Sequence, residues 1–262
     1  MNHKRFFTII AMVAMCITLF STCKKDKKDE PETIFEWEHE MVLVEQGIFT
    51  MGCTTDGDCV SGELPTHQVT LTKSYYIGKY EITQAQWKAV MGDNPSYFQG
   101  DDLPVEGITW NEVQTFITKL NELTGKSYRL PTEAEWEFAA RGGNQSKGYK
   151  YSGSNNINDV AWYGFVAGGN SGNSIHTVGI KQPNELGIYD MSGNVWECCS
   201  DWYGVYSDEA QTDPQGPAVG SKCVIRGGSY YLGAMYCRVA CRSQWDSNTI
   251  ALDMGFRLAL SL

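Results

Sequence analysis

The sequence predicts one loop-rich domain that mixes helices with short strands. Its 27 glycines, with 8 Trp, 14 Tyr and 10 Phe, indicate an irregular backbone that is held in place by large rings. Three segments begin with the same helix-capping pattern, and the strand-like runs are short. With 262 residues, of which 42% are hydrophobic, the chain is long enough to bury a substantial core.

The three helices are predicted from capping boxes. In each, a Thr is followed three residues later by Gln or Glu, as in Thr83-Gln84-Ala85-Gln86. The Thr hydroxyl accepts a bond from a backbone amide that the helix leaves free, and the later side chain bonds back to the Thr amide. We expect helices from Thr83 to about Met91, from Thr109 to about Gly125, and from Thr132 to about Gly142.

Strands are expected where hydrophobic and polar residues alternate or apolar runs are short. These segments are Met41–Met51, Gln68–Tyr80 and Lys222–Arg226, with further strands around Arg238 and Phe256. The segment 142–183 is rich in Gly, Asn, Ser and Tyr, so we expect it to be mostly irregular.

The N-terminus resembles a bacterial lipoprotein signal. Lys4 and Arg5 precede an apolar run from Phe6 to Phe20, which is too short to span a bilayer comfortably but suits a signal peptide. We expect residues 1–22 to be removed, Cys23 to be acylated, and residues 23–39 to form a polar tether. The alternative is ordinary cleavage that leaves Cys23 as a free thiol.

Charge and histidine content narrow the function classes. The formal net charge of −10 argues against nucleic-acid binding, which needs a basic surface. The 4 His do not form a familiar zinc-hydrolase signature. The sequence therefore predicts a cell-envelope protein that contacts the membrane only through its lipid anchor. The anchor places it on the periplasmic side or on the outer surface of the outer membrane.

Export implies an oxidising compartment. Cys53 and Cys59 flank a tight polar loop and are the expected disulfide. The pairing of the remaining five cysteines cannot be deduced from sequence; they are Cys198, Cys199, Cys223, Cys237 and Cys241.

Five motifs occur in a fixed order along the chain. They are Tyr75-Tyr76-Ile77-Gly78-Lys79-Tyr80-Glu81-Ile82-Thr83, Tyr128-Arg129-Leu130-Pro131-Thr132-Glu133-Ala134-Glu135-Trp136-Glu137, Gly187-Ile188-Tyr189-Asp190-Met191-Ser192-Gly193-Asn194-Val195-Trp196-Glu197, Arg226-Gly227-Gly228-Ser229-Tyr230 and Gly255-Phe256-Arg257. Together they resemble the sulfatase-modifying-factor family, the formylglycine-generating enzymes. This resemblance implies a single α+β domain over residues 40–262, a loop-rich variant of the C-type-lectin-like fold with little regular secondary structure.

The third motif is a candidate calcium site. Carboxylates of Asp190 and Glu197, with main-chain carbonyls of Gly193 and Val195, offer the oxygen ligands that Ca²⁺ prefers. The family resemblance also places a calcium here; the alternative is a plain turn before a buried Trp196. A second calcium implied by the family falls in the 155–180 region, where no ligands can be matched.

The resemblance also implies a copper site after Ser229, made of cysteines three and eight residues further on. These positions hold Leu232 and Cys237, so one of the two soft thiolate ligands that select Cu(I) is missing. Cys241 is a possible substitute, but an extended chain would put it about 13 Å from Cys237. If the match to the family pattern contains a gap after Ser229, Cys237 is instead a structural thiol.

Two function classes follow. The resemblance implies an oxidase that converts a cysteine of a sulfatase, or of another protein substrate, to formylglycine through Cys237, Ser229 and copper. The residue at position 232 argues that this activity is weak or absent. The alternative is a non-catalytic protein of the same fold that binds a peptide or glycan, or acts as a scaffold in the cell envelope.

Overall fold

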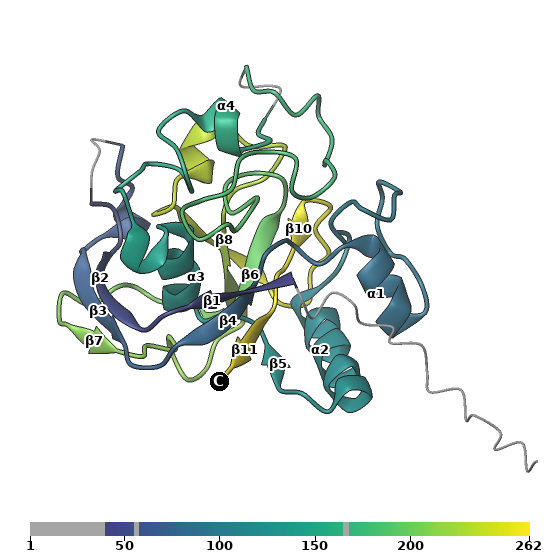
Figure 1. The fold of residues 1–262 in the computed structure, drawn as a ribbon, viewed down its shortest axis with the longest axis horizontal. Helices are drawn as coiled ribbons and strands as arrows, with labels where there is room; N and C mark the ends of the chain where they lie inside the picture. Colours follow the sequence, from purple (N-terminus) through teal and green to yellow (C-terminus); the bar gives the residue numbers. More distant parts are fainter. Residues whose placement is uncertain (1–39, 55–57, 165–167) are drawn as a thin grey trace, which may run out of the picture. The chain divides into compact units, whose positions relative to one another are not determined.

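Three small β-sheets and several short helices are joined by long irregular segments in the computed structural model (Figure 1). The structure describes residues 40–54, 58–164 and 168–262, which belong to one compact unit. The predicted signal peptide, Cys23 and the tether lie outside the described residues. The mixed α and β content and the loop-rich path agree with the predicted class.

The three predicted helices are confirmed. They are α1 (Gln84–Met91), α2 (Trp110–Thr124) and α3 (Glu133–Ala140). Each is preceded by its predicted Thr cap, whose hydroxyl accepts a hydrogen bond from the amide three residues later. Gly92 and Gly125 end the first two helices in the left-handed conformation, which glycine adopts without strain.

The first two sheets correct two strand predictions. One sheet has the order β1 (Met41–Val44), β4 (Tyr75–Gly78), β11 (Ala259–Ser261) and β5 (Tyr128–Arg129), and all its pairs are antiparallel. The other has the order β2 (Gly47–Met51), β3 (His67–Leu71) and β7 (Gln211–Thr212). Each of the predicted strands Met41–Met51 and Gln68–Tyr80 is therefore two strands, because the chain leaves one sheet and enters the other within it.

The third sheet has the order β10 (Met254–Gly255), β6 (Trp196–Trp202), β8 (Lys222–Arg226) and β9 (Arg242–Asp246). The prediction for β8 is confirmed, whereas β6 was not foreseen. Strands β10 and β11 flank Phe256, as predicted, but no strand forms around Arg238. Arg238 directly follows a short 3-10 helix, Ala234–Cys237, so its backbone does not join a sheet. Its buried guanidinium pairs with the carboxylate of Glu63 at 2.6 Å.

The segment 142–183 is mostly irregular, as predicted. Within its described part, regular structure is limited to a 3-10 turn (Gly143–Gln145) and the single-turn helix α4 (Ile157–Val160). A third 3-10 turn, Ser61–Glu63, lies earlier in the chain. None of the described helices has the length and apolar character that a bilayer crossing requires.

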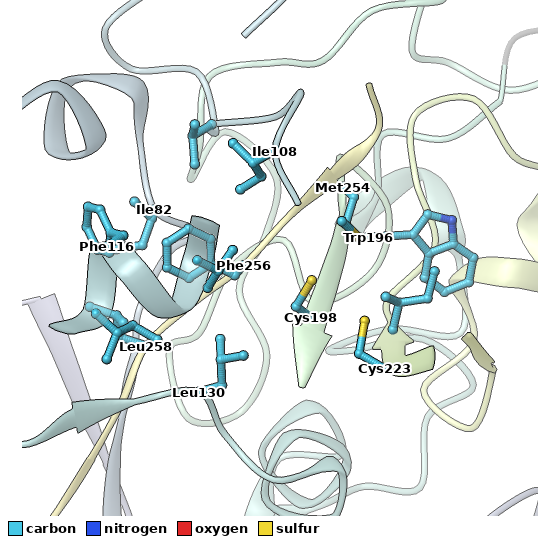
Figure 2. Close-up of a cluster of buried hydrophobic side chains, with 14 of the residues drawn as sticks. Ile82, Ile108, Phe116, Leu130, Trp196, Cys198, Cys223, Met254, Phe256 and Leu258 are labelled. Carbon is cyan, nitrogen blue, oxygen red and sulfur yellow. The ribbon is translucent and has the colours of Figure 1, made fainter. Parts of the chain in front are cut away.

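Two large apolar clusters form the core. The main cluster packs α1 and α2 against β6 and β8, and the rings of Trp87 and Phe116 stack in it at 5.2 Å. Figure 2 shows part of this cluster, with Phe256 and Met254 beside the strand that carries Cys198. The second cluster gathers around α3, with Trp136 and Phe138 fully buried. Area burial of this kind supplies most of the folding free energy.

Buried arginine–glutamate pairs join these elements. Arg226 pairs with Glu137, and Arg242 pairs with Glu133 at 2.7 Å. Burial opposes ionisation of Glu137, but Arg141 and Arg226 outweigh it and hold the pKa of that carboxyl below its usual value. Both carboxylates are on α3, so these pairs fix the helix against β8 and β9.

The predicted disulfide between Cys53 and Cys59 is present. Its sulfurs and the carboxylate of Glu63 lie within 4.8 Å of one another. Since both sulfurs are bonded in the disulfide, this group is a covalent link beside the Glu63–Arg238 pair and not a thiolate metal site.

The α3 pairs generate a stability prediction. Glu137→Gln keeps the side-chain shape but leaves the buried Arg226 guanidinium with only the more distant carboxylate of Glu133, at 3.7 Å. We expect the free energy of unfolding, measured by urea denaturation, to fall by about 3–5 kcal/mol. The matched control is Asp101→Asn in the exposed Lys88–Asp101 pair, for which we expect about 0–1 kcal/mol. A loss in Glu137→Gln no larger than in this control would contradict the role given to the pair.

Candidate functional site

Two adjacent turns form the candidate site. The acidic turn, residues 187–197, leads into β6, and the serine turn, residues 226–232, follows β8. The Gly193 amide donates to the Gly227 carbonyl at 2.8 Å, and the Tyr230 amide donates to the Asn194 carbonyl at 2.7 Å. The structure therefore brings the predicted calcium motif and the predicted catalytic motif into direct contact.

The acidic turn is shaped by left-handed backbone conformations. Asp190, Gly193 and Asn194 have φ angles of 58°, 83° and 60°. A left-handed conformation is uncommon for a residue other than glycine, so two in one turn indicate a strongly held backbone. Asp190 is buried; its Oδ2 accepts a bond from the Gly179 amide at 2.7 Å, while its Oδ1 has no partner. Burial raises the pKa of Asp190 to about 6.

Glu197, the second predicted ligand, is fully buried at the start of β6. Arg257 donates to it through two nitrogens, both at 2.6 Å, and Trp136 Nε1 donates to Oε2 at 2.7 Å. This bidentate pair balances the charge of Glu197 and orients its carboxylate. Arg257 uses its other bonds on the carbonyls of Gly78 and Tyr189, so it is fully engaged at this position.

A third carboxylate, Glu81, was missed from the sequence. It is buried, and it accepts bonds from Asn194 Nδ2 at 2.6 Å and from the Val195 amide at 3.2 Å. Burial first, and then the charges of Asp190 and Glu197, raise the pKa of Glu81 well above its usual value. The only available signal was its place in the first of the five motifs, two residues before the Thr83 cap.

The acidic turn and its surroundings contain more buried carboxylates than positively charged groups. Three buried carboxylates, Glu81, Asp190 and Glu197, lie near the guanidinium of Arg257, and Lys181 adds a weaker positive influence on Asp190. A buried carboxylate without a positive partner is costly, and it responds by taking up a proton. A hard divalent cation at the unpartnered Oδ1 of Asp190 would offset this charge, although the ligand atoms of the three carboxylates do not all lie within 4.8 Å of one another in the described part of the chain.

The serine turn is closed over its hydroxyl. Ser229 is buried, and its Oγ donates to Asp253 Oδ2 at 2.8 Å. Gly228 has φ 76°, and a Cβ there would lie 2.8 Å from the Tyr236 carbonyl and 2.9 Å from the Cys237 sulfur. Glycine at this position therefore lets the turn pack directly on the segment that carries Cys237.

Cys237 lies in a closed apolar environment. It is fully buried with Tyr151, Val160, Ala161 and Tyr163. Burial raises the pKa of the Cys237 thiol far above its usual value, and the neighbouring Cys241 adds to this effect. A thiolate is the form that binds metal, so this environment opposes metal binding.

The two predicted copper positions, Leu232 and Cys237, belong to different apolar clusters. Leu232 packs against the main apolar cluster, whereas Cys237 belongs to a separate small one. The predicted copper site finds no support in this arrangement. Cys241 is also a buried free thiol, and burial raises its pKa to about 12. The chain between the two cysteines is bent, since the Cys241 amide donates to the Arg238 carbonyl at 2.9 Å.

Four aromatic rings continue outward from the serine turn and are here termed the aromatic ladder: Tyr97, Phe98, Tyr230 and Tyr231. Successive ring centroids are 5.1, 5.6 and 6.3 Å apart, and all three contacts are edge-to-face. The end residues are open to solvent, with Tyr97 69% and Tyr231 54% exposed. Sequence analysis did not identify the ladder because its two halves are more than a hundred residues apart.

A cavity of about 380 Å³ lies elsewhere, at the start of α3. Asp201 and Glu133 line it with Arg242. Burial first, and then the Glu133 charge, raise the pKa of Asp201 to about 7. Asp201 Oδ2 accepts a bond from the Glu133 amide at 2.9 Å, and Arg242 donates to Glu133 and to the carbonyls of Gly62 and Gly204. These polar groups are engaged in holding the helix and the neighbouring loops.

Comparison with known proteins gives consistent matches. Residues 27–262 match the family described as "Sulfatase-modifying factor enzyme 1-like domain". The chain is 34% identical to "Chaperone protein LppX" of Paenibacillus barcinonensis, over 85% of this chain and 89% of that protein. It is 30% identical to the "Formylglycine-generating enzyme" of Mus musculus, over 84% of this chain and 74% of that protein.

A solved structure agrees with these matches. "Treponema denticola variable protein 1" superposes with a TM-score of 0.77 and 33% sequence identity, covering 85% of this chain and 95% of that one. The predicted variant of the C-type-lectin-like fold is thereby confirmed.

Proposed function

Because the chain belongs to the sulfatase-modifying factor enzyme 1-like family, we propose that it is a binding member of that family. In this proposal it holds a segment of a partner protein at the aromatic ladder and does not oxidise a cysteine. The observation that carries the proposal is the closed environment of Cys237, together with leucine at position 232.

The chemistry of the two positions argues against an oxidase. Copper in its reduced state needs soft thiolate ligands. Leu232 offers no ligand, and the Cys237 thiol is kept protonated by its apolar surroundings. Ser229 is buried and its hydroxyl is already bonded to Asp253, so a substrate would have to displace this bond to reach it.

The ladder has the properties of a protein-binding surface. Tyrosine rings supply a large contact area at low conformational cost, and their hydroxyls accept and donate hydrogen bonds at a wet interface. Phe98 and Tyr230 hold the outer rings in place, and the Phe98 amide donates to Glu106 at 2.9 Å. A relative named as a chaperone, which this chain matches over 89% of its length, supports a role in protein binding.

The test has an activity arm and a binding arm. We expect the purified, copper-loaded protein to convert no Cys-x-Pro-x-Arg peptide to formylglycine, as measured by mass spectrometry. We expect it to bind a permanently unfolded protein, reduced and carboxymethylated lactalbumin, in fluorescence anisotropy. Tyr231→Ala should weaken this binding about tenfold, as loss of an aromatic anchor does.

Tyr149→Ala, outside the ladder, is the matched control and should leave binding unchanged. Robust formylglycine formation by the parent would show that another cysteine completes a copper site. Absence of lactalbumin binding by the parent, or equal loss of binding in the two variants, would overturn the role of the ladder.

We infer that the acidic turn holds Ca²⁺ through Asp190, Glu197 and the carbonyls of Gly193 and Val195, with Glu81 beside them. The unpartnered Asp190 oxygen and the excess of buried carboxylates support this inference. When bound, the ion would supply positive charge that neutralises the site and ties the turn to β6.

Calcium and pH should act on stability through Asp190. Its folded pKa of about 6 lies above the usual 3.8, so the folded state binds the proton more tightly. In EDTA, Asp190 by itself should therefore raise the free energy of unfolding by about 1 kcal/mol between pH 7 and pH 5, and this contribution is lost as pH rises through 6. At pH 7, Ca²⁺ at a hundredfold excess over Kd should add about 2.7 kcal/mol.

Denaturation curves with Ca²⁺ or EDTA measure both effects. Asp190→Asn should abolish the Ca²⁺ effect and remove the Asp190 share of the pH effect, whereas Asp208→Asn at an exposed position should keep both. An unchanged unfolding midpoint on adding Ca²⁺ to the parent would count against the site.

We further propose that the chain is exported and anchored to the cell envelope through an acylated Cys23. The disulfide between Cys53 and Cys59 supports maturation in an oxidising compartment. Intact mass of protein from the membrane fraction should show acylated Cys23 as the first residue. A mature form that begins elsewhere would contradict the anchor.

A further inference from the structure

Two buried thiols outside the candidate site face each other. Cys198 on β6 and Cys223 on β8 are fully buried in the main apolar cluster, and their side chains are hydrogen-bonded to each other. Figure 2 shows the two sulfurs on neighbouring strands within this cluster. The adjacent Cys199 packs into the second cluster instead, so one cysteine of the Cys198-Cys199 pair faces Cys223 and the other faces away.

The strand register places these thiols on one face of the sheet, beside an irregularity. Cys198 lies opposite Ile225, and Cys223 lies opposite Trp202. Between these two pairings β6 advances by four residues and β8 by two, so β6 carries two extra residues. Such a bulge bends its strand and redirects side chains. The two cysteines are not register partners, and yet their thiols are in contact.

We propose that Cys198 and Cys223 form a second disulfide when the chain matures in an oxidising compartment. The physiological setting of this inference rests on the proposed export, but the reaction itself can be tested on the purified protein. A pair of thiols already in contact loses little conformational freedom on bonding, and oxidising compartments favour such pairs.

The oxidant is a small-molecule or protein disulfide of the compartment. The thiolate of one of the two cysteines attacks one sulfur of that disulfide and releases the other as a thiolate. The thiolate of the second cysteine then attacks the mixed disulfide and releases the second thiol. In total the two cysteines lose two protons and two electrons, and the oxidant is reduced to two thiols.

The pair lies beneath the edge strand β9. Trp245 on the edge strand β9 lies opposite Cys223, and its carbonyl accepts from the Cys223 sulfur at 3.4 Å. Since both thiols are covered in the folded domain, exchange takes place before β9 docks.

The bond would join the two strands that carry the candidate site. β6 continues from the acidic turn, and β8 leads directly into the serine turn. A link between them closes the loop from residue 198 to residue 223 and restricts the unfolded chain. We expect the oxidised protein to unfold at a temperature roughly 5–10 °C above that of the form in which only this bond is absent.

The test is peptide mapping of the mature protein after unfolding and refolding in a glutathione buffer rich in the oxidised form. We expect a peptide linked through Cys198 and Cys223 in the parent and in Cys199→Ser, and its loss, with the lower midpoint, in Cys198→Ser and Cys223→Ser. The Cys199→Ser variant is the matched control, because it alters the adjacent buried thiol.

Recovery of Cys198 and Cys223 as free thiols from the oxidised parent, or of a link through Cys199, would overturn the proposal. If Cys198→Ser or Cys223→Ser fails to fold, mapping of the parent and of Cys199→Ser still decides between these outcomes. Failure of export would be visible separately, as a missing acylated N-terminus in the membrane fraction.

Discussion

Buried guanidinium groups hold this loop-rich domain together. Arg226 illustrates the constraint: it pairs with Glu137 and also donates to the carbonyls of Val239, Ala240 and Cys241. An irregular segment in a core cannot satisfy its own carbonyls as a helix or strand does, and an unpaired buried polar group is costly. A guanidinium has five donors, enough to bind one carboxylate and several carbonyls at once. The price is that each arginine needs its carboxylate.

The same constraint leaves the acidic turn with more negative than positive charge. Arg257 is committed to Glu197 and to two carbonyls, so it cannot also balance Glu81 and Asp190. Protonation relieves this imbalance at low pH, and a hard cation would relieve it at neutral pH. Stability, pH and calcium are therefore expected to be linked through one carboxyl, that of Asp190. Because the serine turn is hydrogen-bonded to the acidic turn, an ion held there would also order the surface next to it.

Near the serine turn, packing buries the groups that could react and leaves aromatic rings exposed. The groups with nucleophilic potential near the serine turn, Ser229 and Cys237, are both sealed from solvent. The exposed groups are the rings of Tyr97 and Tyr231, which present area and hydroxyls but no reactive thiol. A fold can keep the scaffold of an enzyme family while the site on it changes, because the residues that support the site are structural and the few that react are not.

The sequence by itself determined the features whose physical cause is local. Capping boxes at Thr83, Thr109 and Thr132 need only four consecutive residues, and the Cys53–Cys59 bridge closes a short loop, so both were predicted correctly. The main carboxylates of the acidic turn were also readable, because they lie within one motif. Tertiary structure alone decided the split of the first strands between two sheets, the strand β6, and the placement of Glu81 beside the acidic turn. It also decided the contact between Cys198 and Cys223, which lie on neighbouring strands beside a bulge. These features depend on which distant segments meet, and pairing across a sheet depends on burial and register that no short window of sequence contains.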